Sequence, residues 1–249
     1  MGDALLGGIS PGTPLYKEVK RKITESMRDG EWKPGETIPS EKALCARFGV
    51  SIGTLRKAVD ELTSENLLIR HRGRGTFVAS HNRERLFFHF FHIVPHDGEK
   101  EYPHVELVEF AEGRADTVTA RKLGIATGAE VFRFVNKLSI GGRPAIVDEI
   151  TVPASLFPGL TESHLRERPN TLYHFYQESY GVSVLRTEER LRAAKASAAH
   201  ARILDIPEGE PLLQIIRVAL SYRDQPVELR FSYVDTRDYE YFCQREGSG

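Results

Sequence analysis

The first part of the chain has apolar residues at the spacing of short amphipathic helices. A first helix is predicted over residues 14–29, because an apolar residue recurs at every fourth position and Gly30 then ends the pattern. The apolar stripe consists of Leu15, Val19, Ile23 and Met27. A second helix is predicted over residues 41–48 behind a Ser40 cap, and a third helix begins behind a Ser51 cap.

The third helix and the segment after it place positive charge on their polar side. Apolar residues fall at Leu55, Val59 and Leu62, and the other side presents Thr54, Arg56 and Lys57 near the helix N-terminus. A hairpin is then predicted with Arg72-Gly73-Arg74-Gly75 at its tip, because glycine permits positive φ there. This order of elements is typical of a winged helix-turn-helix, whose recognition helix enters the DNA major groove.

The second part of the chain contains an internal repeat. Residues 120–135 are echoed by residues 201–216, and each copy continues into a proline-containing turn and a further strand. The repeated unit is therefore a short helix, a strand, a hairpin and a strand. Between the copies we expect a helix over residues 170–180 and a strand over residues 182–193. Two such units predict an antiparallel sheet covered by helices, which makes the whole chain α+β.

The junction between the two parts is first polar and then strongly apolar. A strand is predicted over residues 86–94, and it includes His89 and His92, with His96 close behind. In a strand His89 and His92 point to opposite faces, which disfavours a chelate, so we expect no metal and keep a histidine site as the alternative. The predicted division is a flexible tail over 1–12, a winged helix-turn-helix domain over 13–79, a linker over 80–88 and a second domain over 89–245.

Composition and charge narrow the class of function. The 249 residues are enough for two ordinary domains. Residues 1–80 hold 13 Lys and Arg against 10 Asp and Glu, a net charge of +3. The remaining residues hold 21 against 25, a net charge of −4. The positive charge of residues 1–80 suits nucleic acid binding by the first part of the chain. Two cysteines make no disulfide framework, and nothing resembles a signal peptide or a membrane span. We therefore expect a cytoplasmic protein with no cofactor and no membrane contact.

Residues 13–79 resemble the DNA-binding domain of the GntR family of bacterial transcription regulators. The resemblance is carried by Gly30, Pro34-Gly35, Ile38-Pro39-Ser40-Glu41, Leu44, Phe48-Gly49-Val50-Ser51, Thr54-Leu55-Arg56, Ala58, Leu62, Leu67 and the segment Arg72 to Val78. It implies base or phosphate contacts from the third helix and contacts from the hairpin, or wing. The expected DNA-binding residues are Ser40, Lys42, Ser51, Thr54, Arg56, Lys57, Arg72, Gly73, Arg74, Gly75 and Thr76.

Two positions depart from the common pattern of that family. Lys42 and Ile52 stand where members commonly carry arginine. Lysine keeps a phosphate contact but loses the bidentate fork of arginine. Ile52 cannot hydrogen-bond a guanine edge, although it can touch a thymine methyl group.

Residues 86–243 are similar to the UTRA ligand-sensing domain that defines the HutC subgroup of this family. The resemblance is carried by the Ala-x-x-Leu-Gly-Ile segment at 120–125, Gly141-Gly142-Arg143-Pro144, Tyr180-Gly181, Glu189, Leu204, Gly209-Glu210-Pro211-Leu212 and Pro226-Val227-Glu228. It implies a chorismate-lyase-like fold without lyase activity and a small effector in a cleft beside the sheet. Sugar-phosphate-sensing members carry two arginines where this chain has Asn136 and Leu138.

Polar residues on the predicted strands are candidates for lining that cleft. Glu228, Arg230 and Ser232 alternate and share one strand face, which should meet solvent or a polar cleft because burial under helices would be costly. The expected effector-binding residues are His89, Asn136, Asp148, Glu149, Arg186, Glu189, Glu228, Arg230 and Ser232. Their mixture of arginine and carboxylates suggests a polar, zwitterionic or carboxylate-bearing metabolite.

These features predict a homodimeric transcriptional regulator, a repressor rather than an activator, that binds a palindromic operator and is controlled by a small polar effector. One alternative is an enzyme that retains chorismate-lyase chemistry, which lacks a visible catalytic constellation. A second is a fused aminotransferase regulator, for which the second part is too short. A third is an architectural protein that binds DNA without sequence preference.

Overall fold

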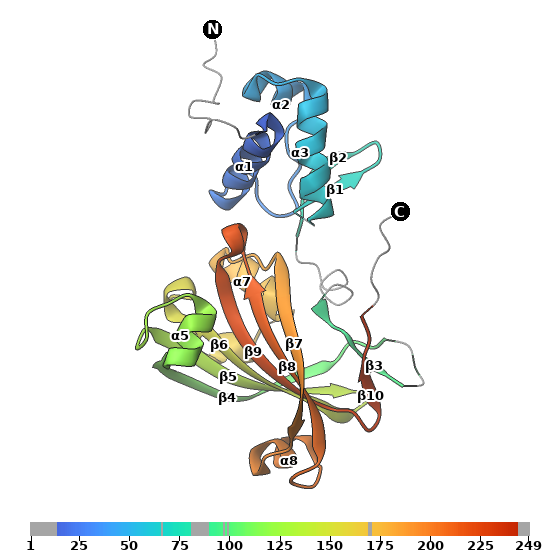
Figure 1. Cartoon of the computed structure of the whole chain (residues 1–249), viewed down its shortest axis with the longest axis vertical. Coiled ribbons are helices and arrows are strands. Elements are labelled where there is room, and N and C mark those ends of the chain that lie inside the picture. The colour runs from blue at the N-terminus through green and yellow to red at the C-terminus, as the bar shows by residue number, and fades with distance from the viewer. Residues whose placement is uncertain are drawn as a thin grey trace. The chain divides into compact units, whose positions relative to one another are not determined.

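The computed structural model describes residues 14–65, 67–80, 90–96, 98, 100–168 and 171–243. The chain divides into two compact units, Met1–His81 and Asn82–Gly249 (Figure 1). Within the described residues, no helix has the length and apolarity needed to cross a membrane.

The first unit consists of three helices and a two-stranded hairpin. Its elements are α1 (Leu15–Arg28), α2 (Glu41–Phe48), α3 (Ile52–Ser64), β1 (Leu68–His71) and β2 (Gly75–Val78). The strands pair antiparallel across the turn at residues 72–74. The three predicted helices and the predicted hairpin are confirmed.

The core of the first unit follows the predicted apolar stripes. Helix α3 packs against both α1 and α2. The buried side chains include Val19, Ile23, Leu44, Phe48, Leu55 and Leu62. Leu15 was expected in the stripe, but it is 38% exposed and is the first residue of α1.

The segment before α2 is held to the hairpin. The backbone N–H of Ile38 donates to the Thr76 carbonyl at 2.9 Å, and Thr37 forms an antiparallel bridge with Phe77. This pairing fixes the hairpin relative to the start of α2, so the helices and the wing form one body.

The second unit is built on a six-stranded antiparallel sheet. The strands are β4 (His104–Arg114), β5 (Glu130–Ile140), β6 (Arg143–Pro153), β7 (Arg186–Lys195), β8 (Pro211–Leu220) and β9 (Pro226–Asp235), in the spatial order β4-β5-β6-β9-β8-β7. A separate pair joins β3 (Ile93–Pro95) to β10 (Tyr239–Tyr241).

Helices cover both faces of this sheet (Figure 1). The helical segments are α5 (Thr117–Leu123), η1 (Ala154–Leu156), α6 (Glu162–Arg166), α7 (Leu172–Tyr180), α8 (Ala198–Leu204) and η2 (Tyr222–Asp224). Helix α7 packs on the face that carries Phe134 and Ile150, whereas α5 and α8 pack on the face that carries Leu229 and Val147. The sheet face that carries Phe134 and Ile150 also carries Leu138 and Val234, and it is called the α7 face below.

The internal repeat is confirmed as a structural duplication. The first copy is α5, β5 and β6, and the second copy is α8, β8 and β9. The two copies meet at the centre of the sheet, where β6 pairs with β9. Equivalent residues of the two copies therefore approach one another across the middle of the sheet.

Two predicted strands begin later than expected. The prediction over 86–94 is wrong at Phe90, which is helical, and the strand starts only at Ile93; residues 86–89 lie outside the described residues. The Phe90 ring is buried edge-on against Tyr173, with ring centroids 5.4 Å apart. The strand predicted over 182–193 starts at Arg186, because Val182 and Val184 pack into the core beneath α7.

Candidate functional site

The N-termini of α2 and α3 carry capped, exposed polar residues. Ser40 Oγ accepts from the Ala43 N–H at 3.3 Å, and Ser51 Oγ accepts from the Thr54 N–H at 3.2 Å. Each cap uses one of the N–H groups that a helix start leaves without a partner. The remaining first-turn N–H groups and the helix dipole favour an anion there, as a phosphate would be.

Glu41 links these two helix starts to the hairpin. Its Oε2 accepts from Arg56 Nε at 3.0 Å, and its Oε1 lies 4.0 Å from Arg70 Nη2. Arg56 remains exposed and keeps its terminal nitrogens free of any described hydrogen-bond acceptor. The pair therefore orients the guanidinium of Arg56 without neutralising its full donor set.

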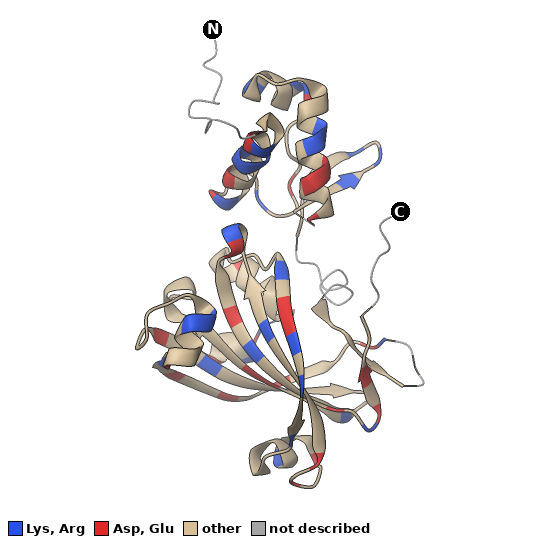
Figure 2. Cartoon of the chain, in the orientation of Figure 1, with Lys and Arg blue, Asp and Glu red and all other residues tan. Residues whose placement is uncertain are grey.

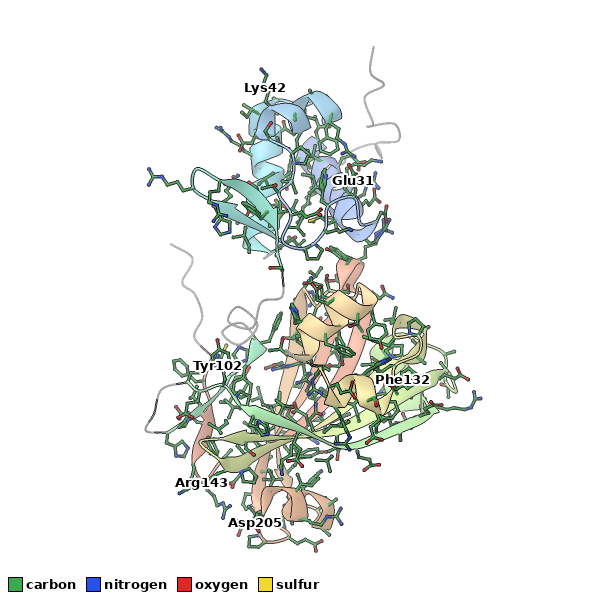
Figure 3. All side chains as sticks on the ribbon, turned by 180° about the vertical axis from the view of Figure 1, so that it is seen from behind. Glu31, Lys42, Tyr102, Phe132, Arg143 and Asp205 are labelled. Carbon is green, nitrogen blue, oxygen red and sulfur yellow. The ribbon has the colours of Figure 1, made fainter. Side chains whose placement is uncertain are left out.

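The other cations of the first unit differ in direction. Lys42 is exposed and projects outward from α2 (Figure 3). Lys57 is also exposed, but its ammonium lies 4.1 Å from the ring centroid of Tyr16 on α1. Arg56 and Lys57 are neighbours in sequence, yet one contacts α2 and the other contacts α1.

The wing exposes its two arginines and its glycines. Arg72 and Arg74 are exposed at the turn, and the guanidinium carbon of Arg74 lies 5.9 Å from the Phe77 ring centroid. Gly73 and Gly75 have φ of 75° and 110°, so the turn uses backbone conformations that favour glycine. Basic residues thus mark both α3 and the hairpin tip (Figure 2), an arrangement suited to a nucleic acid backbone.

The second unit contains a cavity of about 610 Å³ on the α7 face of the sheet. Its polar lining includes Asn136, Asp148, Arg168, Thr171, Arg217 and Arg230, and its apolar lining includes Phe90, Leu107, Leu138 and Leu172. A concave site with apolar walls and a few convergent polar groups is the usual form of a small-molecule pocket.

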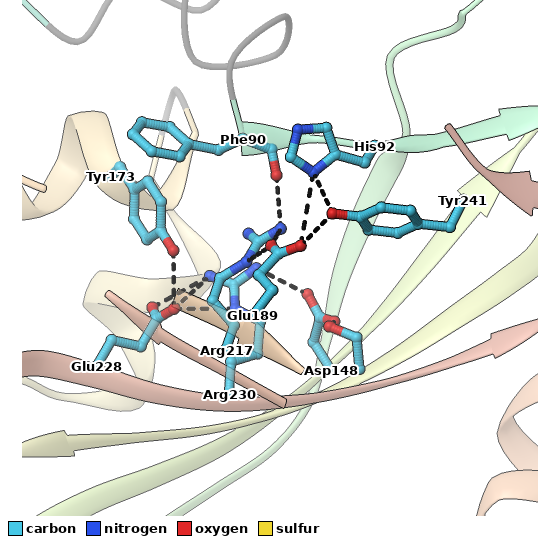
Figure 4. Close-up of polar contacts among 10 residues, drawn as sticks. Phe90, His92, Asp148, Tyr173, Glu189, Arg217, Glu228, Arg230 and Tyr241 are labelled. Carbon is cyan, nitrogen blue, oxygen red and sulfur yellow. Dashed lines mark hydrogen bonds and ion pairs between the residues drawn. The ribbon is translucent and has the colours of Figure 1, made fainter. Parts of the chain in front are cut away.

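Arg230 is the centre of a buried polar network in the pocket floor (Figure 4). Its Nη1 donates to Asp148 Oδ2 at 2.9 Å and its Nε donates to Glu228 Oε1 at 2.9 Å. Glu228 is 0% exposed and also accepts from the hydroxyls of Tyr173 and Tyr176 on α7, at 3.0 and 2.8 Å. Burial, and then the charge of Glu228, raise the pKa of both tyrosines, so each hydroxyl stays protonated and donates.

Arg217 connects the sheet to the start of the second unit (Figure 4). Its Nε donates to Glu189 Oε1 at 2.6 Å, and its Nη2 donates to the Phe90 carbonyl oxygen at 2.6 Å. Burial alone would raise the pKa of Glu189, but contacts with His92, Arg217 and the Tyr241 hydroxyl together lower it to about 2. A pocket residue, Arg217, thereby holds the backbone at Phe90, the first described residue after the 81–89 segment.

The expected effector residues fall into three groups. Asn136, Asp148 and Arg230 line the pocket. Glu189, Glu228 and Ser232 lie behind the lining, and Ser232 Oγ donates to Asp148 Oδ1 at 2.5 Å. Glu149 Oε1 lies 2.9 Å from His200 Nε2 on the opposite face of the sheet. Arg186, on the outer strand β7, pairs with Asp224 of η2. The position of His89 lies outside the described residues.

One expectation about the alternating strand residues needs correction. The three residues were expected to face solvent or a cleft, because burial beneath helices would be costly. Only Arg230 lines the pocket, whereas Glu228 and Ser232 are buried. The cost is offset because Arg230, Asp148 and the two tyrosine hydroxyls complete a hydrogen-bonded network.

Sequence reasoning missed Arg168, Tyr173 and Arg217. The internal repeat contained a signal for one of them, since aligning the two copies places Arg217 at the position of Asn136. The structure puts both of these residues in the lining of one pocket. Arg168 and Tyr173 carried no comparable signal, because neither belongs to the repeat.

Two family models match the chain. The model described as "Bacterial regulatory proteins, gntR family" matches residues 15–78, and the model described as "UTRA domain" matches residues 99–240. Together they cover both units, and the second alone covers more than half of the chain.

Named relatives and a solved structure agree with these matches. The chain is 31% identical over 209 residues to the histidine utilization repressor of Klebsiella aerogenes, covering 84% of this chain and 85% of that protein. It is 28% identical over 241 residues to the mannosyl-D-glycerate transport/metabolism system repressor of Escherichia coli (strain K12), covering 94% and 98%. The ligand-binding domain of a protein assigned to the GntR-family transcriptional regulators, from Bordetella bronchiseptica, is similar with 32% identity and a TM-score of 0.59, covering 62% of this chain and 96% of that domain.

Proposed function

Because the chain belongs to the GntR family of bacterial regulatory proteins and carries a UTRA domain, we propose that it is a transcriptional repressor released or recruited by a small-molecule effector. The first unit binds operator DNA and the second unit binds the effector. The observation that carries the proposal is the exposed cationic surface at the start of α3 and on the wing, in a chain that also holds a concave pocket with polar lining residues. Relatives named as repressors support repression over activation.

In this proposal the start of α3 enters the major groove. Thr54 and Arg56 contact bases or phosphates, while Ser40, Lys42, Ser51 and Lys57 contact phosphates. The ion pair with Glu41 supports the role of Arg56, since it holds the guanidinium in one orientation before DNA arrives. The wing residues Arg72, Gly73, Arg74, Gly75 and Thr76 contact the backbone or the minor groove.

The functional form is a homodimer on a palindromic site. Two-fold symmetry would set two copies of α3 about one DNA turn, ~34 Å, apart on successive half-sites. A repressor of this kind acts on the bacterial chromosome, so it works in the cytoplasm. No catalytic step is part of the proposal, and the carboxylates nearest the pocket are engaged as ion-pair partners of arginines.

Effector control can begin at Arg217. A ligand that competes for its guanidinium weakens the hydrogen bond to the Phe90 carbonyl and so alters how the chain is held where the second unit begins. The effector changes DNA affinity only to the extent that it prefers one arrangement of this segment.

Selection of operator DNA from genomic fragments by the full chain, at one fixed salt concentration, tests the proposal. We expect enrichment of a palindromic sequence and loss of that enrichment in the double variant Arg56→Ala, Arg72→Ala. Sedimentation of the free chain should give the mass of a dimer. Equal binding to all fragments, with affinity set by salt alone, would support the architectural alternative instead.

A further inference from the structure

Among the described residues, one arginine in the pocket wall has no opposite charge beside it. Arg168 lines the pocket, and its Nη1 donates to the Leu165 carbonyl oxygen. Among the described residues it has no carboxylate partner, in contrast to Arg217 and Arg230. Burial lowers the pKa of Arg168; Tyr176 acts against this shift, and the positive charge of Arg230 adds to it. A partly desolvated guanidinium of this kind is stabilised by an anion from the ligand.

The N-terminus of α7 opens onto the same pocket. Thr171 is the N-cap residue of this nine-residue helix, but its side chain caps no backbone N–H. Its Oγ1 is buried without a hydrogen-bond partner in the described structure, and Thr171 and Leu172 both line the pocket. First-turn N–H groups and the helix dipole favour negative charge at this place. Arg168 and Thr171 with the start of α7 are called the anion end below.

The sheet wall of the pocket offers acceptors instead. Asn136 is only 2% exposed, and its Oδ1 is buried without a partner among the described residues. It lies directly opposite Asp148 in the pairing of β5 with β6, and both residues line the pocket. An unsatisfied buried amide oxygen costs free energy, which a ligand recovers by donating a hydrogen bond to it. Asn136 and Asp148 are called the donor-binding end.

The distribution of charge limits the ligand to one negative group. Arg217 is neutralised by Glu189, and Arg230 is held by Asp148 and Glu228, so Arg168 is the one pocket-lining arginine of the α7 face without an acidic partner in the described structure. A dianionic phosphate would leave one charge uncompensated in the presence of Asp148. A carboxylate matches a single guanidinium in charge and in geometry.

From this geometry we infer that the pocket takes a small monocarboxylate that carries an N–H donor. The carboxylate binds the anion end and the N–H group binds the donor-binding end, with an apolar middle against Leu107, Leu138 and Leu172. This inference rests on the proposed effector role of the second unit and assigns the chemical class of that effector.

Thermal unfolding of the full chain with matched compounds provides the first test. The panel contains the common amino acids, 4-aminobutyrate and hippurate, each beside its carboxamide, together with 3-benzoylpropionate, glucose 6-phosphate and glycerol 3-phosphate. We expect the largest rise in Tm from a monocarboxylate with an N–H donor and little or none from its carboxamide. 3-Benzoylpropionate replaces the N–H of hippurate by CH2, so it should stabilise less than hippurate. A largest rise from a phosphate ester or from a carboxamide overturns the inference, and so does the absence of any stabilising monocarboxylate.

Pocket variants provide the second test, by calorimetric titration of the best monocarboxylate. Arg168→Gln should weaken binding about 10- to 100-fold, because a hydrogen-bonded charge is lost, while binding of the matching carboxamide stays unchanged. Arg166→Gln is the control, since Arg166 also lines the pocket but already pairs with Glu162. Asn136→Leu should weaken binding of the N–H compound and leave 3-benzoylpropionate unaffected. Equal losses in Arg168→Gln and Arg166→Gln would show that the anion end is not specific.

Operator binding, measured beside these titrations, separates the two proposals. Selective DNA binding that responds only to a phosphate ester would leave the repressor function intact and reject the carboxylate. Carboxylate binding by a chain that shows no preferred DNA site would reject the repressor function and leave the ligand class intact.

Discussion

The two units of the chain use arginine in opposite states. In the first unit Arg56 and the wing arginines are exposed, with much of their donor capacity facing water. In the second unit Arg217 is buried and the Arg230 side chain is only 12% exposed. Both are held by carboxylates, and Arg217 is also held by a backbone carbonyl. Exposed arginines contribute little to folding and leave their charge for a partner, whereas buried arginines are part of the fold and constrain what can bind beside them.

The largest effect should follow from removing Arg230, the arginine at the centre of the buried carboxylates of the second unit. Arg230→Gln leaves Glu228 and Asp148 buried without their counter-ion, so we expect the free energy of unfolding to fall by about 3–5 kcal/mol. Urea titration of the full chain measures it. Arg186→Gln, on the exposed outer strand of the same sheet, should change stability by no more than about 0.5 kcal/mol. An Arg230→Gln protein as stable as the parent would remove the distinction between the two units.

Acid should weaken the second unit through Glu189. Its pKa is lowered to about 2 in the folded chain, against about 4.3 in an unfolded one. Its contribution is therefore complete above about pH 4.5 and is lost progressively as the pH falls towards 2. Between pH 5 and 2, the Tm of the second unit should fall more steeply in the parent than in Glu189→Gln. The variant starts less stable and has no carboxylate to protonate at this position. An equal fall of Tm with pH in the two proteins would contradict the role given to Glu189.

A smaller effect is expected from the exposed arginine of α3, and it should appear in DNA binding. Arg56→Ala should leave unfolding within about 0.5 kcal/mol of the parent and weaken operator binding by about 1–3 kcal/mol. Arg28→Ala, at the exposed end of α1, is the matched control and should bind the operator normally. Loss of stability without loss of operator binding would show that Arg56 stabilises the fold, as Arg217 and Arg230 do, rather than binding DNA.

The smallest effect should come from the wing. Arg72→Ala removes one exposed cation, so it should weaken binding to operator and to unrelated DNA alike and reduce the salt slope of binding by about 1. Gel shifts at several salt concentrations measure the slope. A selective loss on operator DNA alone would instead assign Arg72 to base recognition.

The same contrast explains how far the sequence could be read. The first unit is set by local signals, such as the Ser40 and Ser51 caps and the glycines of the turn, so its helices and exposed polar residues were predicted together. The second unit was predicted as strands, helices and a repeat. Its pocket depends on pairings distant in the chain, as when Tyr173 and Tyr176 of α7 bury Glu228 of β9.

Single residues illustrate the limit. Strand alternation predicted that Glu228, Arg230 and Ser232 share one strand face. It gave no means of telling a pocket wall from a buried floor, and Glu228 and Ser232 are buried while Arg230 lines the pocket. Glu149 was grouped with Asp148, its neighbour in sequence, yet successive strand residues face opposite ways and Glu149 reaches His200 on the other face. Arg168 became visible only once α6 and α7 were placed over the sheet.

The duplication at the centre of the sheet has an evolutionary consequence. Asn136 and Arg217 occupy matching places in the two copies of the repeat, yet one is a neutral amide and the other a charged group. Half of the pocket can therefore mutate toward a new metabolite while the other half preserves the connection to Phe90. A lineage of such proteins could diversify in what it senses without having to reinvent how it responds.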